Sequence, residues 1–296
     1  MKDKKIGLIH LAPVLLSAIT SSILAWVLER SNILAEVETP FSRSPSMEAS
    51  IYNLIVFMTL IGFGSILLYI LVKFRKIGVL KLLFLSSLAL SLLGITEIYI
   101  LAFSTILSLE YIFLEDLSIL IAAVVSLLTV YTIATSENEY IIALLMLFYG
   151  SSAGSLFGVL LPIWTIVLVA VALSLYDLYS VFKGPLKHLI ELEKSRSPTS
   201  SRGGAMRRDS IFRGAVVPFK GLYLGIGDVI FYSMMASAVF LKPYPSILRL
   251  MVAVVALSLG AYITFKLVEK RGALPALPLP LLLTILAYIT FLILEL

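Results

Sequence analysis

The sequence predicts an all-α membrane protein with nine transmembrane helices, its N-terminus in the cytoplasm and its C-terminus outside. The first observation is composition: of 296 residues, 60% are hydrophobic and only 14% are charged, and the mean hydropathy is +1.04. A soluble domain carries about a quarter charged residues and could not bury so much apolar surface. The other two observations are the length of the apolar runs and the distribution of basic residues between them.

Nine segments are long and apolar enough to cross a bilayer, which requires about 20 residues per helix. The segments are residues 7–28, 51–73, 79–104, 117–134, 140–160, 162–182, 221–241, 246–267 and 275–294. The first one follows Lys2, Lys4 and Lys5 as in a signal peptide, but it is too long for a signal-peptide core, so we expect a retained helix. Pro162 separates the fifth and sixth segments, because proline cannot continue a helix ladder.

The orientation follows from the positive-inside rule, by which Lys and Arg gather in cytoplasmic loops. Placing the N-terminus inside leaves only four of the 23 basic residues outside: Arg30, Arg43, Lys242 and Arg249. The net charge of +5 is therefore explained by topology and lipid contact, and we expect no nucleic acid as a partner. These features predict a multi-pass protein of the cell membrane.

Three regions are expected along the chain. Residues 1–182 hold six helices, residues 183–220 form a largely flexible cytoplasmic loop, and residues 221–296 hold three helices. The loop is poor in apolar residues at 195–204, which favours flexibility. Residues 211–219 are apolar and β-branched but too short to span, so we expect a strand at the membrane face or a re-entrant segment.

Carboxylates are costly at bilayer depth and usually functional there. Only Glu97, Asp177 and Asp228 fall well inside a predicted span. Asp177 lies about 9 Å from the cytoplasmic end of its helix and Asp228 about 12 Å from the same face, at 1.5 Å per residue. Adjacent antiparallel helices would bring these two to one depth, whereas Glu97 lies nearer the outer end and is expected to form a buried hydrogen bond or to reach the interface.

Charge and depth alone leave three functions open for the two aspartates: ion or proton transport, intramembrane proteolysis, or hydrogen bonds that join helices. The surrounding residues favour proteolysis. Gly225 and Gly227 let a backbone approach closely and let the helix start unwind, as a protease that must open a substrate helix requires. Tyr176 is placed to pack beside Asp177, and prolines at 275 and 278 leave carbonyl groups unpaired at a similar depth.

Other chemistry is not favoured by the sequence. Cysteine is absent, which excludes thiolate sites. The only histidines, His10 and His188, do not form an HExxH motif, so we expect neither a zinc protease nor any other metal or cofactor. Asp209 is expected to be a solvated charge. Three glycines, Gly150, Gly154 and Gly158, recur every four residues on the fifth span and predict close helix packing.

Three short motifs follow one another on the sixth, seventh and ninth predicted spans: Tyr176-Asp177, Gly225-Ile226-Gly227-Asp228 and Pro275-Ala276-Leu277. Together they resemble the signature of the GxGD intramembrane aspartyl proteases, the presenilins and signal peptide peptidases. The residues flanking the motifs, such as Lys183-Gly184-Pro185-Leu186, are similar to presenilin versions, and the short loop and the lack of cysteine suit an archaeal-type homologue.

The resemblance implies an aspartic endopeptidase that hydrolyses peptide bonds within transmembrane helices by means of an activated water. It implies Asp177 and Asp228 as the catalytic residues, and it implies supporting roles for six others: Tyr176, Gly225, Gly227, Pro275, Ala276 and Leu277. The substrates would be single-span proteins with their N-terminus outside, partner subunits would not be required, and a homo-oligomer is left open.

Two alternatives remain beside this reading. The first is a membrane transporter or cation leak pathway that uses the same intramembrane aspartates. The second is a prepilin-type peptidase, which also carries a GxGD motif. The Pro275-Ala276-Leu277 motif and the nine spans argue against the second alternative.

Overall fold

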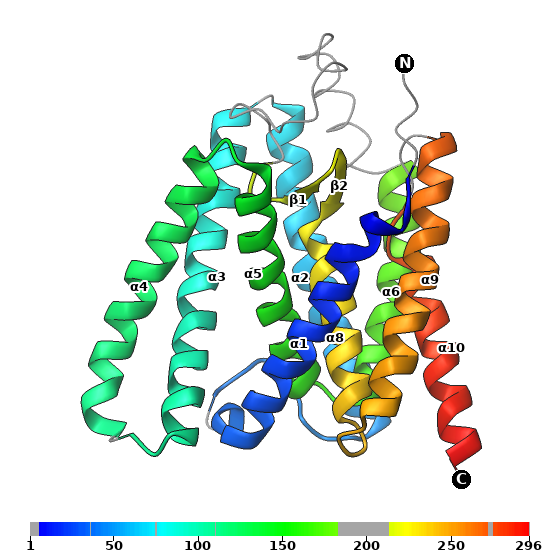
Figure 1. The fold of residues 1–296 in the computed structure, drawn as a ribbon. Helices are drawn as coiled ribbons and strands as arrows, with labels where there is room; N and C mark the ends of the chain where they lie inside the picture. The colour runs from blue at the N-terminus through cyan, green and yellow to red at the C-terminus, as the bar shows by residue number, and fades with distance from the viewer. Residues whose placement is uncertain are drawn as a thin grey trace.

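The computed structural model describes residues 6–35, 37–74, 76–109, 111–182, 213–271 and 275–295, and it is almost entirely helical there (Figure 1). Two short 3-10 helices and one pair of strands accompany nine long helices in these ranges. The elements are η1 (Leu8–Leu11), α1 (Ala12–Ser31), η2 (Ile33–Ala35), α2 (Met47–Lys73), α3 (Ile77–Ile106), α4 (Tyr111–Thr135), α5 (Glu139–Leu160), α6 (Ile163–Phe182), β1 (Val216–Phe219), β2 (Leu222–Gly225), α8 (Ile226–Leu241), α9 (Ile247–Arg271) and α10 (Pro278–Glu295).

The nine long helices of the described ranges match the nine predicted spans one to one, which confirms the predicted fold class. Seven of them are long and apolar enough to cross a membrane, and α8 and α10 are shorter apolar helices. In Figure 1, α1 begins at the end of the bundle that carries the β1–β2 hairpin, and α10 finishes at the opposite end. Below, these two ends are called the hairpin end and the α10 end.

Two predicted helix starts are wrong, and both lie next to the aspartates. The seventh span was expected from residue 221, but residues 222–225 form strand β2 and the helix begins at Ile226. The ninth was expected from residue 275, but Pro275, Ala276 and Leu277 are not helical and α10 begins at Pro278. Proline disfavours helical geometry in the residue before it and is well suited to the first helical position, so Pro278 sets this boundary.

The hairpin explains the apolar run that precedes α8. Strand β1 pairs antiparallel with β2, from Val216 opposite Gly225 to Phe219 opposite Leu222. The two residues between them, Lys220 and Gly221, both have positive φ (49° and 81°), as a two-residue hairpin turn requires. Of the two structures expected for residues 211–219, the strand is therefore observed for 216–219. The flexible loop expected at 195–204 lies outside the described residues.

The centre of the bundle is built from α1, α5 and α8, which pack against one another. The three glycines of α5 face α8 and let the two helices pack closely, as predicted: a Cβ at Gly154 would lie 2.5 Å from the carbonyl oxygen of Ile230. Four phenylalanines gather around this centre, with ring centroids 5.4 to 6.3 Å apart: Phe41, Phe57, Phe157 and Phe231. Helix α8, which carries Asp228, is thus held by small residues on one side and aromatic rings on another.

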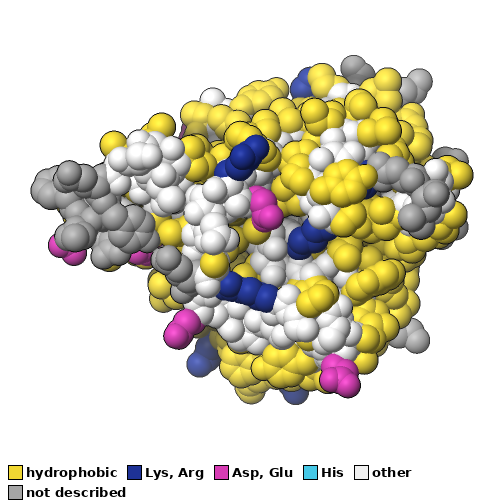
Figure 2. Space-filling view, turned by 90° about the horizontal axis from the view of Figure 1, so that it is seen from below, with side chains coloured by type: hydrophobic (Ala, Val, Ile, Leu, Met, Phe, Trp, Pro, Cys, Tyr) yellow, Lys and Arg dark blue, Asp and Glu magenta, His cyan; other side chains and the backbone are white. Residues whose placement is uncertain are grey.

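The outer surface fits a bilayer. Only 17%, 17% and 22% of the apolar spans of α2, α3 and α4 are buried, so these three helices expose large hydrophobic side chains such as Phe63, Leu90 and Leu127. Figure 2 looks onto the α10 end and shows apolar side chains over much of its margin, with Lys and Arg groups and an acidic group toward its middle and other charged groups at its edge. A polar end surrounded by apolar sides is the pattern of a membrane-embedded bundle.

Candidate active site

Asp177 lies on α6, one and a half turns before the end of that helix, and its side chain is half-buried. Its carboxylate accepts a hydrogen bond from the backbone N–H of Leu277, with 3.0 Å between the nitrogen and Oδ2. The backbone of Ala276 donates a second hydrogen bond to the same carboxylate. The non-helical segment before α10 therefore holds Asp177 through its exposed backbone N–H groups, which a continuous helix would have used internally.

Asp228 lies in the first turn of α8, three residues after the N-cap residue Gly225. Its carboxylate accepts a hydrogen bond from the backbone of Gly225, which is half of a capping box. This position also places a negative charge at the positive end of the helix dipole. A Cβ at residue 225 would lie only 2.9 Å from Oδ2 of Asp228, so glycine is required there for the carboxylate to turn back onto the backbone.

The two aspartates are close enough for the charge of Asp177 to act on Asp228. They come from different helices, and α6, α8 and α10 pack against one another around them. Both carboxylates also act electrostatically on Tyr232, which is fully buried one turn after Asp228. The structure therefore brings together Asp177, Asp228 and the segment of residues 275–277, which lie up to a hundred residues apart in the sequence.

The two glycines around Asp228 have different surroundings. Gly225 is crowded by the side chain of Asp228, whereas a Cβ at Gly227 would meet nothing within 4 Å. Within 4 Å of a Cβ at either glycine, the described residues place no backbone from another part of the chain. At Gly225 the close contact is made by the aspartate itself, and Gly227 faces open space.

Two polar residues that the sequence did not single out contact the site. The hydroxyl of Tyr232 donates to the carbonyl oxygen of Ala276 at 2.6 Å. Ser65 of α2 hydrogen-bonds the hydroxyl of Tyr176, the neighbour of Asp177. Tyr232 could have been found from its position four residues after Asp228, which is the same face of a helix. Nothing in the sequence connects Ser65 with Tyr176, 111 residues away.

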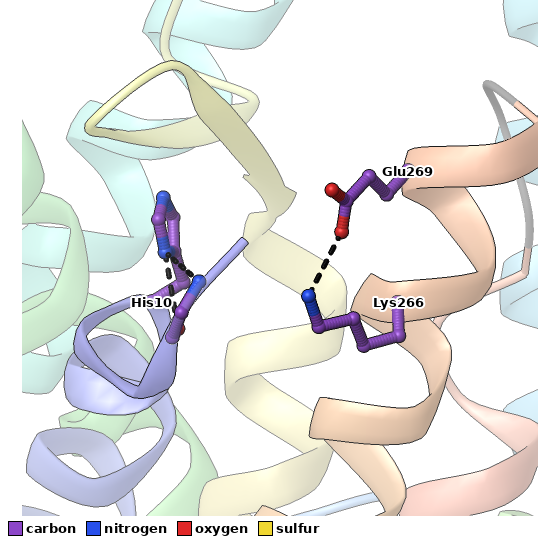
Figure 3. Close-up of polar contacts among 4 residues, drawn as sticks. His10, Lys266 and Glu269 are labelled. Atoms are coloured by element: carbon purple, nitrogen blue, oxygen red, sulfur yellow. Dashed lines mark hydrogen bonds and ion pairs between the residues drawn. The ribbon is translucent and has the colours of Figure 1, made fainter. Parts of the chain in front are cut away.

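Three other titratable groups at the hairpin end, His10, Lys266 and Glu269, have local partners (Figure 3). The ring of His10 contacts the backbone of Gly7, and Lys266 pairs with Glu269 on the same helix at 3.1 Å. Glu97 is half-buried on α3, a helix that packs mainly against α4, and it is not among the charges that act on Asp228. His188 and Asp209 lie outside the described residues.

A cavity of about 500 Å³ lies at the α10 end, away from the aspartates, and it is bordered by Asn32, Arg43, Trp164 and Lys242, among others. The ammonium group of Lys242 donates to the carbonyl oxygens of Gly158 and Val159 at 2.8 and 3.2 Å. Asp228 is at the start of α8 and Lys242 follows its end, so this cavity does not form part of the aspartate site.

A protein-family model described as "Signal-peptide peptidase, presenilin aspartyl protease" matches residues 13–200 of the chain. That range contains Asp177 and ends before Asp228. The chain is 33% identical over 131 residues to Presenilin-B of Dictyostelium discoideum, an alignment that covers 43% of this chain and 26% of the relative. It is 27% identical over 176 residues to Presenilin hop-1 of Caenorhabditis elegans, covering 44% of this chain and 48% of the relative. The matches thus span about a quarter to a half of these relatives' length.

Two solved structures of a presenilin family intramembrane aspartate protease, in different crystal forms, have a similar fold. The first has a TM-score of 0.62 at 18% sequence identity and covers 98% of this chain and 100% of the solved one. The second has a TM-score of 0.56 at 21% identity and covers 95% and 96%. At these identities the likeness concerns the fold alone.

Proposed function

Because the chain belongs to the signal-peptide peptidase and presenilin family of aspartyl proteases, we propose that it hydrolyses peptide bonds within transmembrane helices, with Asp177 and Asp228 as its catalytic pair. The observation that carries the proposal is the arrangement of these carboxylates. They come from two helices of a membrane bundle, the charge of one acts on the other, and each accepts hydrogen bonds from backbone N–H groups.

The arrangement suits hydrolysis by an activated water. Two close carboxylates do not both ionise readily, so the pair holds one proton between them. The ionised carboxylate takes a proton from water as the water oxygen attacks the peptide carbonyl carbon, while the protonated carboxyl hydrogen-bonds the carbonyl oxygen. The tetrahedral intermediate then collapses, the C–N bond breaks, and the departing nitrogen receives a proton. The two roles belong to the pair, which titrates as a unit.

The supporting residues act on the positions of the two carboxylates. Gly225 leaves room for Asp228, and Ala276 and Leu277 donate to Asp177. Pro275 precedes this segment and lacks an N–H group, which helps to keep the segment out of a helix. Tyr176 fixes the end of α6 against α2, and Gly227 leaves open space beside Asp228 in which a substrate backbone can lie.

Strand β2 offers a docking edge for an extended substrate. The amide of Ile226 donates to the carbonyl of Ala215, so in this antiparallel ladder the backbone groups of Leu224 and Leu222 face β1, while those of Tyr223 face the other side. No other strand of the described residues pairs with that side. A substrate unwound near its cleavage site can add to this edge, which leads directly into Gly225 and Asp228.

We also propose how the two parts of the chain form the site and where the protein acts. Residues 1–182 carry one aspartate and residues 221–296 carry the other, so the site forms only when the two parts pack together; residues 183–220 connect them on the cytoplasmic side. The protein would act in the cell membrane on single-span substrates with their N-terminus outside, without partner subunits, as a monomer or a homo-oligomer.

The test is cleavage of a purified single-span substrate in detergent, with products identified by mass spectrometry. Wild type is expected to cut within the substrate's transmembrane segment, and Asp177→Asn and Asp228→Asn are each expected to abolish that cleavage. Liposome experiments test the alternative of an ion pathway: cation flux that depends on the same aspartates, in the absence of any cleavage, would replace the protease assignment.

A further inference from the structure

One peptide group connects the helix of Asp228 with the side chain of Asp177. The carbonyl of Ala276 and the N–H of Leu277 belong to the same amide, and in a trans peptide they point in opposite directions. The carbonyl oxygen accepts from the hydroxyl of Tyr232 at 2.6 Å, and the N–H donates to Asp177 at 3.0 Å. Tyr232, the peptide group and Asp177 therefore form a continuous chain of hydrogen bonds.

The direction of this chain is set by chemistry. A carbonyl oxygen can only accept, so the Tyr232 hydroxyl is the donor, and a backbone N–H can only donate, so Asp177 is the acceptor. A hydrogen bond on the carbonyl side polarises the amide and strengthens the donor on the nitrogen side. The effect is largest where water is excluded, and the side chain of Tyr232 is fully buried.

The position of Tyr232 links the two aspartates mechanically as well. It lies on α8 four residues after Asp228, which places both side chains on one face of that helix. The segment it holds has few internal constraints, because the first helical hydrogen bond of α10 is the one from Leu281 to the carbonyl of Leu277. A displacement of α8 would therefore move Asp228 and, through Tyr232, the amide that orients Asp177.

We infer that Tyr232 is a positioning residue of the proposed reaction, which fixes the Ala276–Leu277 peptide so that its N–H is directed at Asp177. The inference rests on the proposed protease function. Tyr232 acts on the reaction through this peptide and does not itself contact the reacting atoms. Its role is to keep the carboxylates of Asp177 and Asp228 in a fixed position relative to each other during proton transfer.

The experiment compares Tyr232→Phe with Tyr288→Phe in the cleavage assay. Each variant removes the hydroxyl of one buried tyrosine that donates to a backbone carbonyl. In the control, the hydroxyl of Tyr288 donates to the carbonyl oxygen of Lys242 at 3.2 Å, at the α10 end. Both should lose thermal stability to a similar extent. Only Tyr232→Phe is expected to lower kcat, by about tenfold, with KM within about twofold of wild type. This is the effect expected from the loss of one hydrogen bond next to a charged group.

The outcomes separate this inference from the function on which it rests. If wild type cleaves and Asp228→Asn does not, the protease assignment stands. A kcat for Tyr232→Phe equal to wild type, an equal fall in both tyrosine variants, or a change confined to KM would then overturn the positioning role alone. If wild type does not cleave at all, the proposed function fails and this inference fails with it.

Discussion

Gly154 of α5 lies directly against Ser233 of α8: a Cβ on the glycine would be 2.4 Å from the Cβ of the serine and 2.5 Å from the carbonyl oxygen of Ile230. No real pair of side chains comes so close, so any other residue at 154 must push α8 away. Ser233 follows Asp228 by less than two turns. The packing of α5 against α8 therefore determines where one of the two aspartates lies.

We expect Gly154→Ala to destabilise the protein and to reduce cleavage together. Overpacking of a tight contact costs about 1–3 kcal/mol, and here the atoms that must move include backbone of α8. Thermal unfolding in detergent and the cleavage rate measure the two effects. Gly94→Ala is the matched control, because a Cβ there meets nothing within 4 Å; that variant should keep its activity and unfold at the same or a slightly higher temperature. Equal behaviour of the two variants would contradict the close contact.

Gly225→Ala should impair cleavage with little loss of stability. The new Cβ would lie 2.9 Å from Oδ2 of Asp228, so the carboxylate must rotate away from the backbone N–H that it accepts from. We expect a fall in kcat of about tenfold or more, from the loss of one charge-assisted hydrogen bond. Gly227→Ala, where the Cβ has open space, should retain more activity than Gly225→Ala, and the reverse order would count against this geometry.

Ser65→Ala and Tyr176→Phe should each lower activity, and the double variant should be no worse than the stronger single one. Their hydroxyls bond each other, so removing either partner removes the same link between α2 and α6. Kinetics of all three variants measure the coupling. The pair Ser91 and Tyr149, bonded at 2.8 Å between α3 and α5, supplies the control: its removal is expected to change stability and not kcat. If the double variant of Ser65 and Tyr176 lost activity by the sum of the two single effects, the two residues would act separately.

Lys242→Met should lower thermal stability without changing kcat. The ammonium group of Lys242 donates to the last carbonyls of α5, where a positive charge also meets the negative end of the helix dipole. Loss of these charged hydrogen bonds costs about 1–3 kcal/mol. Lys266→Met, which breaks an ion pair with Glu269 and a contact with the ring of Tyr262 on the same helix near the surface, should have a small effect on stability. A large loss of kcat in Lys242→Met with unchanged stability would contradict a purely structural role.

Much of the fold could be predicted because the bilayer imposes it. A chain in lipid must satisfy its backbone within each helix, so apolar length alone indicates where the helices are. The proline at 162 separated α5 from α6 as expected, and the glycines of α5 predicted a tight helix contact. The regular rise per residue applies to the depth of Asp177, which lies within α6, but not to the stretch from Lys220 to Gly225 before Asp228, which is a turn and a strand.

The helix boundaries at the site were not predicted correctly, for a local reason. Residues 222–225 are as apolar as a helix start, and only pairing with residues 216–219 makes them a strand. The hydropathy of a segment does not show whether another segment pairs with it as a strand. The contacts of Tyr232 with Ala276 and of Ser65 with Tyr176 escaped prediction in the same way, because each joins residues far apart in the chain through the packing of separate helices.

By itself, the sequence determined that this is a nine-helix membrane protein with two carboxylates inside its spans and an interrupted helix near them, since these properties depend on the cost of exposing polar groups to lipid. Only the tertiary structure decided which atoms hold those carboxylates. The backbone of residues 276 and 277 faces Asp177 because α6 and α10 pack against each other at one particular register. The backbone of Gly225 faces Asp228 because strand β2 ends at Gly225 and α8 begins at Ile226. The place of α8 in the bundle is fixed by close contacts such as the one that Gly154 of α5 makes with it, where one added methyl group would displace a helix.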